Sequence, residues 1–466
     1  MPALNIQKFK SLVLTPSGFS IRTIMEKTPG TKSPTALQAV KGMNDVLPAE
    51  SAKWEYFEQT ATRVARQYGY RNMRAPIVEH TPLFVRSIGE VTDIVEREMY
   101  SFEDRLNGEK LTLRPELTAG LVRAAVEANL VYNGPVRVYS MGQMFRHERP
   151  QKGRYRQFSQ FDVECFGFDG PDVDAEIMML VTRLWRELGI HDVGLQINSL
   201  GNVDERAAYR ATLIAHYEAN LEALDDEAKR RLHTNPMRLL DSKVASVIEV
   251  NKTAPNLLDS LVGESRAHFD GLQQLLTDAG VPFVVNPRIV RGMDYYNRTA
   301  FEFVTERFGA PLTVCGGGRY DGLFEQLGGK PTPAIGFGMG IERVLMMLPD
   351  DQKSNGLDAY IVHAGVGAQK AASILSESLR DSGLAVAQHG GGGSFKSQMK
   401  KADASGARYA LIIGDNEVAA GTVAVKPLRD GNGAPIQGEQ AIITSSAVAA
   451  HLRIACDPRL ASDPRA

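Results

Sequence analysis

The chain has 466 residues, which is room for roughly three domains of about 150 residues each. Apolar residues make up 43% of the chain and charged residues 23%, a composition typical of soluble globular proteins and not of disordered or fibrous ones. Because 53 Lys and Arg stand against 55 Asp and Glu, the formal net charge is −2. This balance excludes nucleic-acid binding by bulk charge alone but permits a local basic surface.

The ends of the chain and its cysteines limit where the protein works. Residues 1–35 carry five basic residues against one acidic residue, but a transit peptide would be richer in Arg, so we expect a poorly ordered N-terminal extension. Cys165, Cys315 and Cys456 form neither a C-x-x-C pair nor a disulfide framework, which fits a reducing, cytoplasmic compartment and predicts no zinc site. No segment approaches the ~18 consecutive apolar residues of a membrane span, so no membrane partner is predicted.

Periodic apolar residues divide the rest of the chain into regions. Residues 36–200 mix helical spacing with short alternating strands, and residues 201–280 are mostly helix-like. Strand-like segments return over 281–345, so we expect one domain over 36–348 with the helical segment inserted in it. The helical spacing near the start of this domain is clearest for Trp54, Phe57, Ala61, Val64 and Ala65.

A polar linker over 349–355 precedes a region of different character. Within residues 356–456, strand-like and helix-like runs alternate, which predicts a small α/β domain with a largely parallel sheet. Residues 457–466 are rich in Pro and Asp, and we expect this tail to fray. The predicted strands are 358–362, 384–386 and 409–413, and the predicted helices are 368–382 and 394–405.

The most informative stretch covers residues 136–168. Alternation predicts an antiparallel hairpin in which a charged, Gly-containing loop joins two strands. The first strand would turn Tyr139, Met141 and Phe145 to one face, with Arg146 and Glu148 on the other. The second would place on one face Phe158, Gln160, Asp162 and Glu164. This polar face either lines a pocket or is simply the wet face of a sheet, and because buried polar groups need partners, the pocket is the favoured reading.

Four further polar segments occur at 111–118, 291–296, 315–322 and 334–343. In the last, Gly336, Gly338 and Gly340 alternate, which would let a strand approach a flat ligand, and Arg343 follows them. The spacing is not the G-x-G-x-x-G of dinucleotide-binding proteins. A tight strand-to-helix turn is an equally good explanation for this segment taken alone.

Together, these segments resemble the motifs of class II aminoacyl-tRNA synthetases. Residues 145–148 with the following basic loop are similar to motif 2, and residues 336–343 to motif 3. Residues 291–296 and 316–321 resemble the two signatures of the histidyl-tRNA synthetase family, and 41–48 resembles its opening segment. The resemblance runs from 37 to 455 and departs at Leu117, where a small residue is common, and at Ser159, where His is usual.

The resemblance implies an α+β catalytic domain with a six-stranded antiparallel sheet and flanking helices, followed by an anticodon-binding α/β domain. A helix and strand near 50–80 would build the interface of a homodimer. The family reaction joins L-histidine to ATP, giving histidyl-adenylate and pyrophosphate, and then transfers the histidyl group to the 3′ end of tRNA(His). Mg²⁺ would accompany the ATP.

The resemblance also implies site residues. Arg146 and Arg291 are the expected catalytic groups, since a guanidinium fork can bridge the amino-acid carboxylate and the α-phosphate. Histidine would be bound by Glu116, Thr118, Arg146, Gln160, Glu164, Arg291, Tyr295, Tyr296 and Tyr320, and core packing is the alternative role of these tyrosines. ATP would be bound by Arg146, Glu148, Arg154, Phe158, Arg291 and Arg343. Either tRNA contact or a solvated helix face explains Lys396, Lys400 and Lys401.

One other function fits the same resemblance. Proteins related to these synthetases act as regulatory subunits of ATP phosphoribosyltransferase, and they bind histidine without charging tRNA. Such a protein is expected to lack the anticodon-binding domain and some of the ATP-binding arginines. This chain retains Arg146, Arg291, Arg343 and about 100 residues after the linker, which favours the ligase.

Overall fold

The computed structural model describes residues 37–90, 92–293, 295–349, 356–430 and 433–456. The N-terminal extension predicted for 1–35, the tail and nearly all of the linker lie outside the described residues. No described helix is both long enough and apolar enough to pass through a membrane.

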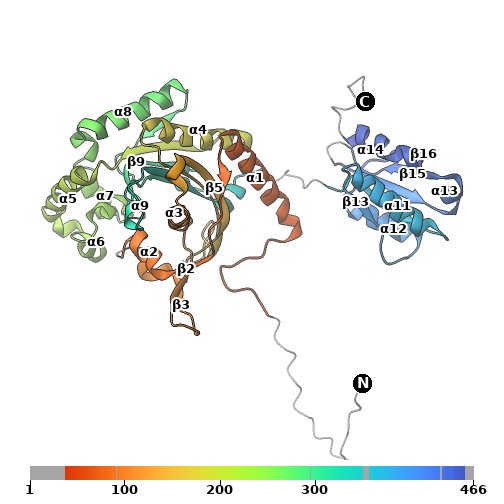
Figure 1. The fold of residues 1–466 in the computed structure, drawn as a ribbon, viewed down its shortest axis with the longest axis horizontal. Helices are drawn as coiled ribbons and strands as arrows, with labels where there is room; N and C mark the ends of the chain where they lie inside the picture. Colours follow the sequence, from red (N-terminus) through yellow and green to blue (C-terminus); the bar gives the residue numbers. More distant parts are fainter. Residues whose placement is uncertain (1–36, 91, 294, 350–355, 431–432, 457–466) are drawn as a thin grey trace, which may run out of the picture.

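The larger region, up to residue 349, is built on one large, strongly curved sheet (Figure 1). Its strand order is β1-β5-β6-β11-β10-β9-β7-β8, and each inner pair from β5 to β7 is antiparallel. The strands are, in chain order, β1 Arg71–Asn72, β5 Val136–Phe145, β6 Gln157–Phe166, β7 Gly194–Ser199, β8 Phe283–Val285, β9 Asn297–Thr305, β10 Leu312–Arg319 and β11 Ala334–Gly340.

The sheet therefore differs from the expected six-stranded antiparallel sheet. It has eight strands and is mixed, because β1 pairs in parallel with β5 and β8 pairs in parallel with β7. Six antiparallel strands do form its interior. The two additional edge strands contain only two and three residues, which is too short for alternation of side chains to reveal them.

The predicted hairpin is confirmed, with Val136 opposite Phe166 and Phe145 opposite Gln157. The first strand ends at Phe145, so the prediction that Arg146 and Glu148 continue it is wrong. A backbone hydrogen bond from Arg146 to Arg156 prolongs the pairing by one step before the loop opens.

Two long helices, α1 (Pro48–Gln67) and α4 (Pro171–Glu187), pack on the convex face of this sheet (Figure 1). Phe57, Ala61 and Val64 of α1 are fully buried, which confirms the predicted helical stripe. Pro48 occupies the first helical position, where the missing N–H group has no intrahelical partner to lose.

The opposite face is covered by shorter elements. Helices α3 and α9 pack against β5 and β6 in a second apolar cluster, and a small sheet of order β2-β4-β3 lies beside them. These elements are β2 Val78–His80, α2 Thr81–Ile88, β3 Tyr100–Glu103, β4 Lys110–Leu113, α3 Thr118–Glu127 and α9 Leu323–Gln326. Helix α10 (Ile341–Leu345) instead packs beside α1 in the cluster on the convex face.

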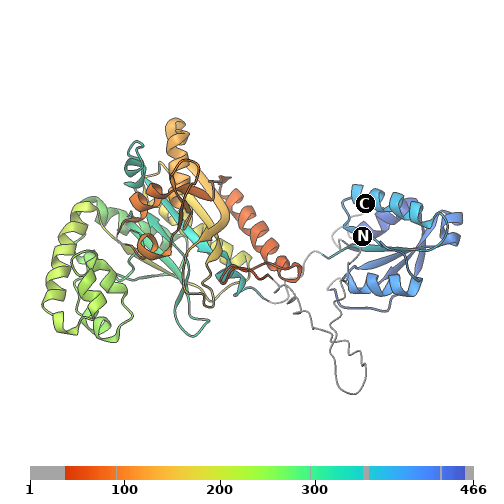
Figure 2. The same cartoon turned by 90° about the horizontal axis from the view of Figure 1, so that it is seen from below.

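The segment predicted to be helical over 201–280 is helical, and its helices gather at one end of the sheet (Figures 1 and 2). They are α5 Val203–Glu218, α6 Asp226–Arg231, α7 Ala245–Asn251 and α8 Gly263–Asp278. The charged run at 225–231 is a solvated helix face, as predicted, with Glu227 paired to the exposed Arg230. A short 3₁₀ turn, η4 (Pro236–Asp241), turns back toward the sheet.

The C-terminal region has its own five-stranded sheet of order β13-β12-β14-β15-β16 and its own apolar core. The three predicted strands are parallel, and β15 and β16 add an antiparallel edge. The elements are β12 Ala359–His363, α11 Ala368–Asp381, β13 Val386–Gln388, α12 Phe395–Ala404, β14 Tyr409–Ile413, α13 Asp415–Ala420, β15 Thr422–Pro427, β16 Ala441–Thr444 and α14 Val448–Cys456.

Candidate active site

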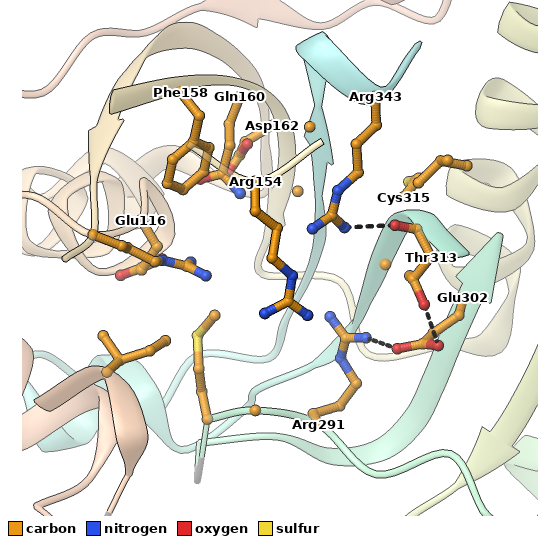
Figure 3. Close-up of a pocket in the computed structure, with 18 of the residues that line it drawn as sticks. Glu116, Arg154, Phe158, Gln160, Asp162, Arg291, Glu302, Thr313, Cys315 and Arg343 are labelled. Carbon is orange, nitrogen blue, oxygen red and sulfur yellow. Dashed lines mark hydrogen bonds and ion pairs between the residues drawn. The ribbon is translucent and has the colours of Figure 1, made fainter. Parts of the chain in front are cut away.

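A cavity of about 350 Å³ opens on the concave side of the large sheet. Side chains reach it from β6, β9 and β10, from the 146–156 loop, and from the insertion, and two glycines of β11 also line it (Figure 3). Segments more than 200 residues apart in sequence, such as those of Glu116 and Arg343, thus meet in one place. The residues predicted from sequence that line it are Glu116, Thr118, Arg146, Glu148, Arg154, Phe158, Gln160, Arg291, Tyr295, Tyr296 and Arg343.

Arg291 lies against strands β9 and β10. Its Nη1 is 2.6 Å from Glu302 Oε1, and its guanidinium carbon is 5.1 Å from the centre of the Tyr296 ring. Gly316 makes this position possible, because a Cβ atom there would lie 2.7 Å from Nη1. Burial opposes the charge of Arg291, but Tyr296 and Glu302 raise its pKa above the ordinary value, so the side chain is a cation.

Arg146 approaches the cavity from the end of β5. Its Nε donates to the carbonyl of Pro115 at 2.9 Å, and its guanidinium carbon lies 5.2 Å from the centre of the Phe158 ring. In the loop that follows, Arg154 Nη1 is 3.1 Å from Glu148 Oε2. The Arg146 guanidinium is therefore held at Nε, and its two terminal nitrogens remain to bind an anion.

Arg343 is fixed by two backbone carbonyls. Its Nε donates to Gly153 at 3.1 Å and its Nη1 to Thr313 at 2.7 Å. Burial lowers the pKa of Arg343, and the nearby Arg154 and Arg146 lower it further. Cations that repel one another in a partly buried cavity form a site that an anion would stabilise.

Unpaired acceptors gather on another wall. Glu116 Oε2, Gln160 Oε1 and Asp162 Oδ1 are buried and have no hydrogen-bond partner among the described residues. Gln160 and Asp162 project side by side from β6 in Figure 3. Burial raises the pKa of Glu116, while burial and the neighbouring Glu164 and Glu116 raise that of Asp162 well above its ordinary value. Buried acceptors without donors match a small ligand that carries several N–H groups.

Glu164 and Tyr320 lie behind the cavity wall rather than on it. Glu164 Oε1 accepts from Thr118 Oγ1 at 2.6 Å, and Oε2 accepts from the Tyr320 hydroxyl. Burial raises the pKa of Glu164 to about 8. The alternating glycines of β11 thus have two uses: Gly336 leaves room for the Glu164 carboxyl, and Gly338 and Gly340 line the cavity.

The three tyrosines pack together in the core, and two of them also line the cavity. The Tyr295 ring lies 4.6 Å from that of Tyr296 and 5.6 Å from that of Tyr320, and all three belong to a buried cluster. Tyr295 and Tyr296 also line the cavity. The unusual residues Leu117 and Ser159 disturb none of these contacts: Leu117 is buried in the core, and the Ser159 N–H donates to Glu342 Oε1 at 2.7 Å.

Sequence reasoning missed several residues that line the cavity. Glu302 is an acid between two apolar pairs, Ala300-Phe301 and Phe303-Val304, and that pattern could have identified it. Thr313 gave no such indication. Arg238 and Asp241 reach the cavity from η4, and no sequence pattern predicts that the insertion folds back to this point.

Two sets of residues lie apart from this arrangement. Lys396, Lys400 and Lys401 are exposed on α12 of the C-terminal domain. Across the described parts of the chain, no three side chains of His, Cys, Asp or Glu are grouped as metal ligands would be.

Comparison with known proteins matches both halves of the chain. Residues 42–344 match the family model described as histidyl-tRNA synthetase, and residues 358–442 match that of an anticodon binding domain. The chain is 58% identical over 411 residues to a histidine–tRNA ligase of Paraburkholderia phytofirmans, covering 87% of this chain and 92% of that protein. It is 60% identical over 396 residues to the histidine–tRNA ligase of Dechloromonas aromatica, covering 84% and 92%. The crystal structure of apo S. aureus histidyl-tRNA synthetase superimposes with a TM-score of 0.74 at 34% identity, covering 90% of this chain and all of that one.

Proposed function

Since this chain belongs to the histidyl-tRNA synthetase family, whose members are ATP-dependent histidine–tRNA ligases, we infer that the cavity on its large sheet is where L-histidine reacts with ATP. One observation carries this proposal: Arg146, Arg291 and Arg343 converge on the same cavity as the unpaired acceptors of Glu116 and Gln160. A site with three guanidinium groups on one side and acceptors on the other suits an amino acid placed against a triphosphate.

In the first step, a carboxylate oxygen of histidine attacks the α-phosphorus of ATP. A new P–O bond forms, the bond to the bridging oxygen breaks, and pyrophosphate leaves with that electron pair. Negative charge builds on the oxygens around phosphorus, and we assign its stabilisation to Arg146 and Arg291 as catalytic residues. These cations are held in place by Pro115 and Glu302 before the reaction, so little reorganisation is needed.

The remaining ATP contacts are assigned from position. Arg343 faces the γ-phosphate or the adenine plane, Phe158 offers a ring beside Arg146, and Arg154 and Glu148 meet the phosphates and the base from their loop. Mg²⁺ fits this site as a partner of the phosphates, because such ions are often held by few protein ligands, and it would supply further positive charge. We propose no zinc site.

Histidine is proposed to bind along β6. Its α-ammonium group has three N–H donors, which correspond to the unpaired oxygens of Glu116, Gln160 and Asp162, with Thr118 beside them. Its imidazole would bind near Glu164, Tyr296 and Tyr320, with Tyr295 packing against both tyrosines. The Glu164 carboxyl already has two partners, so we propose that histidine exchanges one of them or is oriented through Tyr320.

The anticodon-binding domain, proposed as 356–456, would bind tRNA(His), with Lys396, Lys400 and Lys401 contacting its phosphates.

We also propose a cytoplasmic homodimer. A second groove, of about 1190 Å³, runs along α1 and β5, and exposed Val46 and Leu47 lie at or beside it. An uncovered apolar surface next to the predicted interface helix is consistent with a second copy of the chain.

The decisive experiment is histidine-dependent exchange of pyrophosphate into ATP, followed by charging of tRNA(His). We expect both activities, and we expect histidinol, which lacks the attacking carboxylate, to support no exchange. A histidine-binding regulatory subunit would bind histidine but show no exchange. Binding without exchange would therefore overturn the ligase assignment in favour of that alternative.

A further inference from the structure

Arg291 is anchored by two residues to which the family resemblance gave no role. Its Nη1 contacts Glu302 Oε1 at 2.6 Å, while the other carboxylate oxygen, Oε2, accepts from Thr313 Oγ1 at 2.9 Å. The carbonyl of the same Thr313 accepts from Arg343 Nη1 at 2.7 Å. Figure 3 shows the resulting unbroken connection from Arg291 through Glu302 and Thr313 to Arg343.

The backbone of β10 is shaped for this connection. Its register with β9 shifts between Thr313 and Cys315, which marks a bulge, and bulges redirect side chains. In a regular strand, neighbouring residues face opposite sides, yet here consecutive residues from Thr313 to Gly316 all line the cavity. Glu302 pairs directly with Gly316, and the absence of a side chain there admits the Arg291 guanidinium. Thr313 and Arg291 therefore reach the two oxygens of one carboxylate.

We propose that Glu302 and Thr313 are positioning residues that fix the spacing and orientation of the Arg291 and Arg343 guanidinium groups. The proposal rests on the function proposed above, in which both arginines bind ATP. Glu302 supplies a negative charge among several cations, and Thr313 prevents its carboxylate from rotating away. Arg291 Nε is buried and has no partner among the described residues, so the guanidinium keeps donors for a phosphate while Nη1 is held.

The effect should fall on the rate of adenylate formation rather than on histidine binding. A cation stabilises the transition state only if it is placed correctly, and a displacement of about 1 Å can cost around a hundredfold in rate. Neither Glu302 nor Thr313 lies on β6, where the acceptors proposed for histidine are found. We expect Glu302→Gln to lower kcat for pyrophosphate exchange by about 30- to 100-fold and Thr313→Val by about tenfold, with KM for histidine within about twofold.

Two matched variants control for structural damage. Thr313→Ser keeps the hydroxyl and should restore most of the exchange rate lost in Thr313→Val. Glu176→Gln breaks a comparable ion pair, in which Arg137 Nε lies 2.9 Å from Glu176 Oε1, away from the cavity. It should retain wild-type exchange. Each variant is checked for wild-type circular dichroism and thermal unfolding. If Glu302→Gln does not fold, the comparison of Thr313→Val with Thr313→Ser tests the proposal instead, because Thr313 is partly exposed.

A double variant separates this proposal from the function beneath it. Because Glu302 contacts Arg291 directly and is linked to Arg343 only through Thr313, most of its effect should pass through Arg291, and Glu302→Gln should lower exchange by less than about threefold in an Arg291→Ala background. An equal loss in both backgrounds, or Thr313→Ser no better than Thr313→Val, would overturn the positioning role. Absence of exchange in the wild-type protein, or normal exchange in Arg291→Ala alone, would instead overturn the proposed function.

Discussion

The two walls of the cavity are built on opposite plans. On the wall formed by β9, β10 and the motif 2 loop, each proposed phosphate-binding arginine is already held by a partner: Arg291 by Glu302, Arg343 by Thr313 and Arg146 by Pro115. On the β6 wall, Gln160 Oε1 and Asp162 Oδ1 have no partner among the described residues. One wall is prepared in advance, and the other is completed by its ligand.

This difference follows from the chemistry each wall is proposed to perform. Charge on the phosphate grows only in the transition state, so cations that are already fixed accelerate the reaction. The amino acid must also be distinguished from others, and we assign this to the imidazole contacts near Glu164, Tyr296 and Tyr320, because another side chain would leave buried polar groups there unpaired. A variant of the first wall should therefore alter rate, and a variant of the second should alter affinity.

The largest effect is expected on the arginine wall. Arg291→Ala should lower adenylate formation by about 10³-fold, close to 4 kcal/mol, because it removes a fixed cation from the developing charge. Rapid-quench measurement of histidyl-adenylate with saturating histidine and ATP would give this rate directly. Histidine affinity should change by less than about threefold, and a loss of affinity as large as the loss of rate would contradict the division between the walls.

The next effect belongs to the acceptor wall. Glu164→Gln replaces an acceptor that binds both the Thr118 and Tyr320 hydroxyls with an amide that offers one oxygen. A buried hydrogen-bonding group that is left unsatisfied costs about 1–3 kcal/mol, so histidine should bind roughly 10- to 100-fold more weakly. Calorimetric titration of each ligand separately would measure it. ATP affinity should be nearly unchanged, and equal losses for both ligands would count against imidazole recognition.

The sequence predicted the acceptor wall better than the wall of arginines and their anchors. Gln160, Asp162 and Glu164 alternate along one strand, so their shared face follows from local periodicity. The anchors of the arginine wall depend instead on which strands pair. Glu302 meets Arg291 only because β9 lies opposite the glycines of β10, and Thr313 faces the cavity only because β10 carries a bulge. Neither feature is encoded within a short window of sequence, and the same limit applies to Arg238 on the insertion.

The smallest expected effect is a pH dependence of stability that arises on the acceptor wall. Burial raises the pKa of Glu164 from 4.5 to about 8, so the folded protein without ligands holds this proton where the unfolded chain has released it. The resulting stabilisation is complete below about pH 4.5 and is lost as the pH rises toward 8. The free energy of unfolding then falls by at most about 1.4 kcal/mol per pH unit.

Urea unfolding from pH 5 to 8.5 measures this effect. The wild-type protein should lose stability relative to Glu164→Gln, whose side chain cannot ionise, while Glu176→Gln should follow the wild type. If the difference between wild type and Glu164→Gln stayed constant across this range, Glu164 would titrate normally, and its carboxyl would be exposed to solvent rather than buried behind the cavity wall.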